Sequence, residues 1–195
     1  MEVVIRPFSL CLIFYSATIL AAQSPPATPQ LRAQSALASQ PEWPKANPAD
    51  VATVEDIVHA FYSTISAPAG GKLDQSRLRS LFVPGGRIVS SVPANSSRAA
   101  DVRILSPEEY VAISDAHTVT SGFFDRNPAN QVERFGTMAH VYSTFESRSH
   151  LEDSKPMARG IKSFELLNSA NRWYILEVYW DWERPNNPIA DRYLH

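Results

Sequence analysis

The feature that most constrains the fold is the run of residues 172–183, where two kinds of side chain alternate near the end of the chain. One alternate set is entirely apolar or aromatic: Tyr174, Leu176, Val178, Trp180 and Trp182. The other set is mixed: Trp173, Ile175, Glu177, Tyr179 and Asp181. Because successive side chains of a strand point to opposite faces, the first set is expected to face a core or a pocket. The run therefore predicts a long strand in a sheet with one apolar face.

Three patterns predict helices earlier in the chain. Thr53 and Asp56 resemble a capping box, and apolar residues follow at helical spacing as far as residue 65. Asp74 is the expected N-cap of a short second helix. Ser106 opens a Ser-Pro-Glu-Glu motif, which is typical of a helix start and predicts a third helix.

Further strands are expected before the final one. The candidates are residues 87–92, 102–105, 134–147 and 159–167, and the last of these leads through a hairpin turn at 168–171. Helices, strands, another helix and then long antiparallel strands form an α+β pattern. The domain is expected to span residues 50–184, with an irregular C-terminal tail at 185–195.

The N-terminal residues favour export. Residues 1–23 contain a short apolar run followed by small residues, which is typical of a signal peptide cleaved near residues 21–24. An uncleaved N-terminal anchor is the alternative interpretation. Residues 24–49 are rich in proline and alanine and are expected to be a disordered linker. We therefore expect a periplasmic or secreted protein that is free of the membrane after cleavage and has no cysteine, because the only one is Cys11.

Charge and motif content exclude several classes of function. The chain has 18 basic and 20 acidic residues and no run of five or more lysines and arginines, which argues against nucleic-acid binding. It has no glycine-rich phosphate loop, so no cofactor is expected. The histidines lack metal-binding spacing, so no metal site is expected either.

The order of elements resembles the nuclear transport factor 2-like superfamily, which includes SnoaL-like proteins and ketosteroid isomerase. Leu81 and Phe82 before a turn, and a terminal strand with Arg172-Trp173 and Tyr179-Trp180, add to the resemblance. It implies a cone, in which a strongly curved antiparallel sheet wraps around about three helices. It also implies a pocket at the open end and a homodimer through the sheet.

The catalytic groups of ketosteroid isomerase are not retained in this chain. The positions that correspond to its three catalytic residues are Phe61, Ser90, and either Ser163 or Gly160. The base and oxyanion donors that enolisation requires are therefore missing. We do not expect that activity.

The resemblance also implies which residues face the pocket. On the last strand these are Leu176, Val178 and Trp180, in agreement with the alternating pattern. On residues 136–147 they are Met138, His140, Tyr142 and Thr144, and on residues 159–167 they are Ile161, Ser163 and Glu165. From this set, His140 and Glu165 are the candidate catalytic pair, and Tyr142, Ser163, Val178 and Trp180 are the candidate ligand-binding residues.

Three hypotheses about function follow. A small-molecule-binding or accessory domain would hold a partly apolar ligand in the pocket. A cofactor-free isomerase or hydrolase would use His140 and Glu165, because burial raises a Glu pKa and pairing raises a His pKa. In the non-catalytic interpretation the same pair satisfies its own polar groups inside the cone. A protein-interaction module would instead use the outer sheet face around Ile175 and Tyr179.

Overall fold

The structure is a computed structural model that describes residues 37, 40, 42–92, 97, 99, 101–118 and 120–195. The expected signal peptide, with Cys11, and most of the expected linker lie outside the described residues. Within the described part, no helix is long and apolar enough to cross a membrane.

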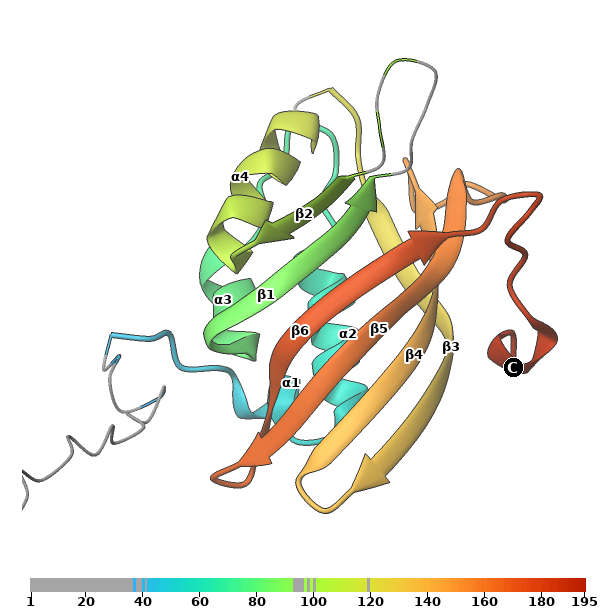
Figure 1. Cartoon of the computed structure of the whole chain (residues 1–195). Helices are drawn as coiled ribbons and strands as arrows, with labels where there is room; N and C mark the ends of the chain where they lie inside the picture. The colour runs from blue at the N-terminus through green and yellow to red at the C-terminus, as the bar shows by residue number, and fades with distance from the viewer. Residues whose placement is uncertain are drawn as a thin grey trace, which may run out of the picture. The chain divides into compact units, whose positions relative to one another are not determined.

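A six-stranded sheet forms the main layer of the domain (Figure 1). Its strands are β1 (Phe82–Val92), β2 (Asp101–Leu105), β3 (Phe124–Phe135), β4 (Met138–Arg148), β5 (Ala158–Ser169) and β6 (Arg172–Trp182). Their spatial order is β2-β1-β6-β5-β4-β3. All neighbours are antiparallel except β1 and β6, which are parallel. The predicted α+β class, with a curved and mostly antiparallel sheet, is confirmed.

Three of the helices begin where the capping motifs predict, and the short helices at 48–51 and 191–193 were not predicted. They are α1 (Pro48–Val51), α2 (Val54–Thr64), α3 (Gln75–Leu81), α4 (Pro107–Thr118) and a short 3-10 helix η1 (Asp191–Tyr193). The Asp56 amide donates to the Thr53 hydroxyl at 3.0 Å, and the Asp56 carboxylate accepts from the Thr53 amide, which completes a capping box. The Glu109 amide donates to the Ser106 hydroxyl at the start of α4.

The core lies between α2 and the inner face of the sheet. The apolar face of α2 is fully buried, and Phe61 makes an edge-to-face contact with Phe164 of β5 at 5.2 Å between ring centroids. Val141 of β4 and Ile175 of β6 belong to the same buried cluster. Burying each such side chain stabilises the folded state by roughly 1.5–3 kcal/mol. The face of the sheet that packs against α2 is therefore its inner face.

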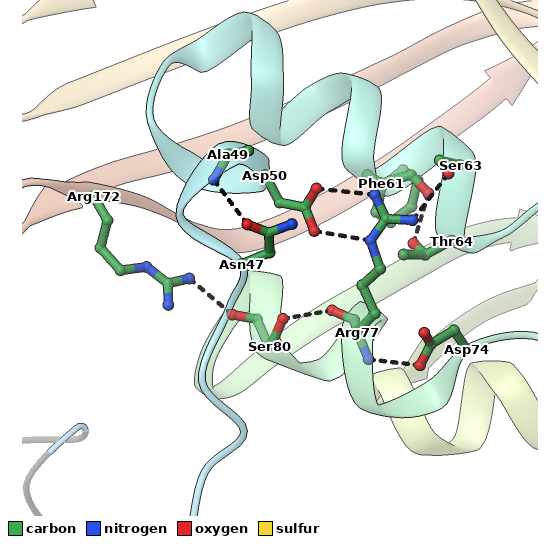
Figure 2. Close-up of polar contacts among 10 residues, drawn as sticks. All are labelled: Asn47, Ala49, Asp50, Phe61, Ser63, Thr64, Asp74, Arg77, Ser80 and Arg172. Carbon is green, nitrogen blue, oxygen red and sulfur yellow. Dashed lines mark hydrogen bonds and ion pairs between the residues drawn. The ribbon is translucent and has the colours of Figure 1, made fainter.

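A polar network fastens α1, α2 and α3 together (Figure 2). The guanidinium of Arg77 donates to both carboxylate oxygens of Asp50, at 2.8 and 2.9 Å, and to the Ser63 hydroxyl at 3.1 Å. These hydrogen bonds lower the pKa of the nearly buried Asp50 carboxyl and raise the pKa of Arg77. Arg172 of β6 donates to the Ser80 carbonyl, which attaches the sheet to the end of α3.

Two strand boundaries differ from the prediction. β1 begins at Phe82, and the residues expected to form a turn at 84–86 lie inside this strand, where its register against β6 shifts. The expected strand at 134–147 is two strands, because the chain turns at Gly136 and β4 starts at Met138. Gly136 has φ +57, a backbone conformation that glycine adopts without a steric penalty.

The alternation of β6 is interrupted by a bulge. Glu177 pairs with Glu165, but Ile175 pairs with the next residue of β5, Leu166, so one residue of β6 has no partner across the ladder. That residue is Leu176, which is 37% exposed. The expected inward position of Leu176 is therefore wrong, because the extra residue of the bulge interrupts the inward–outward alternation of side chains along β6. Ile175 before the bulge and Val178 after it are both buried in the core.

Candidate functional site

A cavity of about 290 Å³ opens between α4 and the inner face of the sheet. Its walls are mostly aromatic: Tyr110 of α4, Phe123, Phe145 of β4, and Trp180 and Trp182 of β6 line it. A second cavity of about 310 Å³ shares Tyr110, Phe123 and Met157 with the first and extends along α4. Each is at the lower end of the size range of small-molecule sites, and their shared wall makes them one candidate site.

A buried ion pair lies in the first cavity. Lys162 Nζ of β5 is 2.8 Å from Asp125 Oδ2 of β3, and their side chains are 5% and 1% exposed. The other Asp125 oxygen accepts a hydrogen bond from the Ser147 hydroxyl of β4, and the Asp125 amide donates to Ser66 Oγ at 3.0 Å. The carboxylate is thus held by groups from two neighbouring strands, Ser147 of β4 and Lys162 of β5, which satisfy the buried charge.

Sheet register places these groups on one face, and Lys162, whose backbone pairs with Ser143 of β4, reaches Asp125 with its long side chain. Asp125 pairs with Ser147 across β3 and β4, and Lys162 pairs with Trp180 across β5 and β6. All four side chains line the cavity. Directly opposed residues of neighbouring strands present their side chains on one face, so the inner pleat gathers them in one place.

Aromatic rings surround the ammonium of Lys162. Lys162 Nζ lies 3.6 Å from the ring centroid of Phe145, 5.1 Å from that of Tyr62 and 5.7 Å from that of Trp180. Ring faces attract a cation, which adds to the attraction of Asp125. Burial lowers the pKa of Lys162, and Asp125 opposes that change.

The ammonium has donors to spare. A protonated lysine carries three N–H groups, and in the described part of the chain Lys162 Nζ has one oxygen acceptor, Asp125. The remaining N–H groups are therefore surrounded by aromatic ring faces and the cavity. A carbonyl or hydroxyl oxygen of a ligand could accept a hydrogen bond there.

Two tyrosines near the cavity stay protonated. The Tyr62 hydroxyl is 2.9 Å from Ser143 Oγ, and Tyr110 packs edge-on against Trp180 at 6.3 Å between ring centroids. Burial raises the pKa of both phenols above the ordinary value. Both rings therefore remain neutral and contribute apolar wall and hydroxyl groups rather than charge.

Solved structures contain the same arrangement of elements. A protein of unknown function with a cystatin-like fold from Nostoc punctiforme aligns with 68% of this chain and 90% of its own, at 10% identity and a TM-score of 0.50. A protein of unknown function from Mycobacterium tuberculosis aligns with 71% of this chain and 75% of its own, at 14% identity and a TM-score of 0.50. A nuclear transport factor 2-like protein of unknown function from Silicibacter pomeroyi aligns with 67% of this chain and 92% of its own, at 12% identity and a TM-score of 0.44.

The chain has a cystatin-like fold, which agrees with the predicted cone of a curved sheet and helices. No protein-family model matches the sequence, and neither does any curated protein. At these identities the fold is what the likeness shows, and function has to be argued from the residues of the site.

Two expected ligand-binding residues lie on the inner face of the sheet. Trp180 lines the cavity, and Val178 is buried in the core next to it on β6. Their inward position agrees with the prediction. Binding of a ligand by either residue stays a prediction.

The four other candidates, His140, Tyr142, Ser163 and Glu165, lie on the outer face of the sheet. On β4 the core-facing residues include Val141 and Phe145, and on β5 they include Lys162 and Phe164. The predicted inner set was therefore displaced by one residue on both strands. Because strand side chains alternate, a displacement of one residue moves every side chain to the opposite face.

The structure does bring the predicted pair together, on that outer face. His140 Nε2 is 2.8 Å from Ser163 Oγ and 3.6 Å from Glu165 Oε1, and the side chains of His140 and Glu165 are 24% and 48% exposed. Ser163 and Glu165 contact the same ring nitrogen. A Ser-His-carboxylate relay needs the two partners on different nitrogens, so this geometry does not form one.

The C-terminal tail covers part of the same outer face. The carbonyl of Tyr193 accepts from the Thr144 hydroxyl, and the carbonyl of His195 accepts from Gln131 Nε2 at 2.9 Å. The rings of Tyr142 and Tyr193 are 5.4 Å apart between centroids. Thr144, expected in the pocket, is therefore buried beneath the tail.

The expected outer interaction surface is also corrected. Ile175 is fully buried in the core, because it lies before the bulge of β6, whereas Tyr179 is exposed.

In the described residues, no group of three or more His, Cys, Asp or Glu side chains is arranged to hold a metal ion.

Sequence reasoning missed Lys162 and Asp125. A signal was present on β5, where Lys162, Phe164 and Leu166 alternate, so the lysine shares a face with two large apolar residues. A charged residue in an apolar alternate set indicates a buried, paired group. Its partner on β3 had no such local signal, because sheet pairing alone brings the two together.

Proposed function

We propose that the domain binds a small, neutral and largely apolar molecule that carries one hydrogen-bond acceptor. The observation that carries this proposal is the Lys162–Asp125 pair within an aromatic-walled cavity. The apolar part of the ligand would pack against Trp180 and Phe145, and its acceptor oxygen would take a hydrogen bond from Lys162 Nζ. This supports the hypothesis of a binding or accessory domain.

Charge balance favours a neutral ligand. Lys162 and Asp125 already compensate each other within the cavity, so the site has no net charge to offer. An anionic ligand would bring an additional negative charge into apolar surroundings next to the Asp125 carboxylate. Burying a charge without a partner is costly, whereas a neutral carbonyl needs only the free N–H of Lys162.

Two ligands with the same carbon skeleton test the proposal. Acetophenone has a carbonyl group where ethylbenzene has a methylene group, and the binding of each to the full chain is followed by tryptophan fluorescence. A hydrogen bond to a charged donor predicts that acetophenone binds about tenfold more tightly than ethylbenzene. The double replacement Lys162→Met plus Asp125→Leu removes both charges and should abolish that preference while retaining apolar binding.

Lys155→Met is the matched control, because Lys155 is exposed and does not line the cavity. It should bind both molecules as the unmodified chain does. Absence of saturable binding by either ligand would contradict the proposal, and so would a double variant that still prefers acetophenone as strongly as the unmodified chain does. Export, a homodimer and catalysis by His140 and Glu165 remain predictions.

A further inference from the structure

We propose that Lys162 forms a reversible imine with a small aldehyde or ketone held in the cavity. This inference rests on the proposed function, because the carbonyl compound must first occupy the aromatic-walled cavity. It adds covalent capture to binding and names the ligand class as carbonyl compounds.

The position of the amine supports this step. Lys162 lines the cavity with a side chain that is 5% exposed, and its Nζ lies 3.6 Å from the ring centroid of Phe145, which lines the same cavity. The chain contains three other lysines, Lys45, Lys72 and Lys155, and all three are exposed. Lys162 is therefore the one lysine placed beside an apolar volume that would hold the carbonyl group against it.

Asp125 supplies the proton acceptor that the reaction needs. The Lys162 ammonium gives one proton to the Asp125 carboxylate, and the amine lone pair forms a bond to the carbonyl carbon. The carbonyl oxygen takes up one proton from the attacking nitrogen and a second from Asp125, and leaves as water when the carbon–nitrogen double bond forms. In sum, an ammonium and a carbonyl compound give a protonated imine and water, with no oxidant or reductant.

The charged groups and rings around Lys162 stabilise the imine product in the same way as the lysine ammonium. The protonated imine carries the same single positive charge as the ammonium, at nearly the same place. Asp125 therefore remains paired, and the faces of Phe145 and Trp180 remain beside a cation. No unpaired charge is created in the interior by the overall reaction.

Burial assists the first step. It lowers the pKa of Lys162, which makes the neutral, nucleophilic amine easier to reach than at an exposed lysine. The apolar walls also exclude water, which slows hydrolysis of the imine.

Reductive trapping tests the inference on the full chain. The folded protein is incubated with benzaldehyde and sodium cyanoborohydride, and the sites of modification are mapped by peptide mass spectrometry. We expect Lys162 to gain the mass of one benzyl group about tenfold faster than Lys45, Lys72 or Lys155. Labelling of the three exposed lysines with Lys162 unmodified would overturn the inference.

Competition provides a readout that needs no substitution. Saturating ethylbenzene, which has no carbonyl group and cannot form an imine, should protect Lys162 from labelling and leave the exposed lysines unaffected, and urea-unfolded chain should label all four lysines alike. Lys162→Arg keeps the positive charge beside Asp125 and should lose only the Lys162 label. Labelling of Lys162 that saturating ethylbenzene does not reduce would contradict capture within the cavity.

The two proposals fail differently. If acetophenone binds but Lys162 is not trapped by benzaldehyde, imine formation is wrong and the proposed binding function stands. If neither binding nor trapping occurs, both are wrong.

Discussion

Each face of the sheet has a pair of a basic side chain and a carboxylate, and the two pairs differ in how deeply they are buried. The inner pair, Lys162 and Asp125, is nearly inaccessible and 2.8 Å apart. The outer pair, His140 and Glu165, is 3.6 Å apart and half-exposed. Water screens the outer pair, so its attraction is weak, whereas the inner charges depend on each other. Neighbouring residues of β5 thus belong to very different electrostatic environments.

The largest expected effect comes from breaking the inner pair. Asp125→Leu leaves the Lys162 ammonium buried without its carboxylate and should destabilise the fold by roughly 3–5 kcal/mol. Urea unfolding of the full chain measures this loss. Adding Lys162→Met should restore most of it, because the double variant has no unpaired charge. A single variant as stable as the unmodified chain would show that the ammonium does not need Asp125.

A third pair, Asp50 and Arg77, has intermediate burial and should give an intermediate effect. Arg77→Met removes two hydrogen bonds to a nearly buried carboxylate and should cost about 2 kcal/mol at neutral pH. The measurement is urea unfolding, with Arg87→Met as the control because Arg87 is exposed. A loss equal to that of the control would contradict the buried role of Asp50.

The same pair predicts a dependence on pH. Arg77 lowers the pKa of Asp50 in the folded state, so the stabilisation is present above the unfolded pKa of about 3.9. It is lost as pH falls through the lower folded pKa. The difference in unfolding free energy between the unmodified chain and Arg77→Met should therefore shrink below about pH 4. A constant difference across acid pH would show that Arg77 does not act through Asp50.

The smallest effect is expected on the outer face. Glu165→Gln removes the charge next to His140 and should change the unfolding free energy by less than about 1 kcal/mol. Thermal unfolding at neutral pH is sufficient to detect a larger change. A loss comparable to that of Asp125→Leu would mean that the outer pair is also a structural element of the sheet.

Local patterns predicted the elements well but not the face of each strand. Capping motifs at Thr53 and Ser106 act within a few residues, so the sequence alone located those helix starts. The inward direction of Trp180 and Val178 followed from alternation. The direction of His140 and Glu165 was not fixed in that way, because both alternate sets of β4 and of β5 contain large apolar residues, such as Ile161 and Phe164 on β5.

The bulge at Leu176 and the Lys162–Asp125 pair depend on contacts between strands that are distant in the sequence. A bulge is visible only in the register between β5 and β6. Asp125 and Lys162 are brought together across β4. The alternation on β5 indicates that Lys162 is buried and paired, but no local pattern identifies Asp125 as its partner. Such features arise from tertiary pairing, which single-strand patterns do not contain.

The most direct test of the central account observes Lys162 itself. The chain has four lysines, and ¹³C labelling at lysine Cε gives each a separate resonance in a two-dimensional NMR spectrum. On titration with acetophenone, the resonance of Lys162, assigned by its absence in Lys162→Arg, should shift, while those of Lys45, Lys72 and Lys155 stay in place. Ethylbenzene should shift it much less. An unmoved Lys162 resonance, or equal shifts at the exposed lysines, would contradict the proposed ligand site at the Lys162–Asp125 pair.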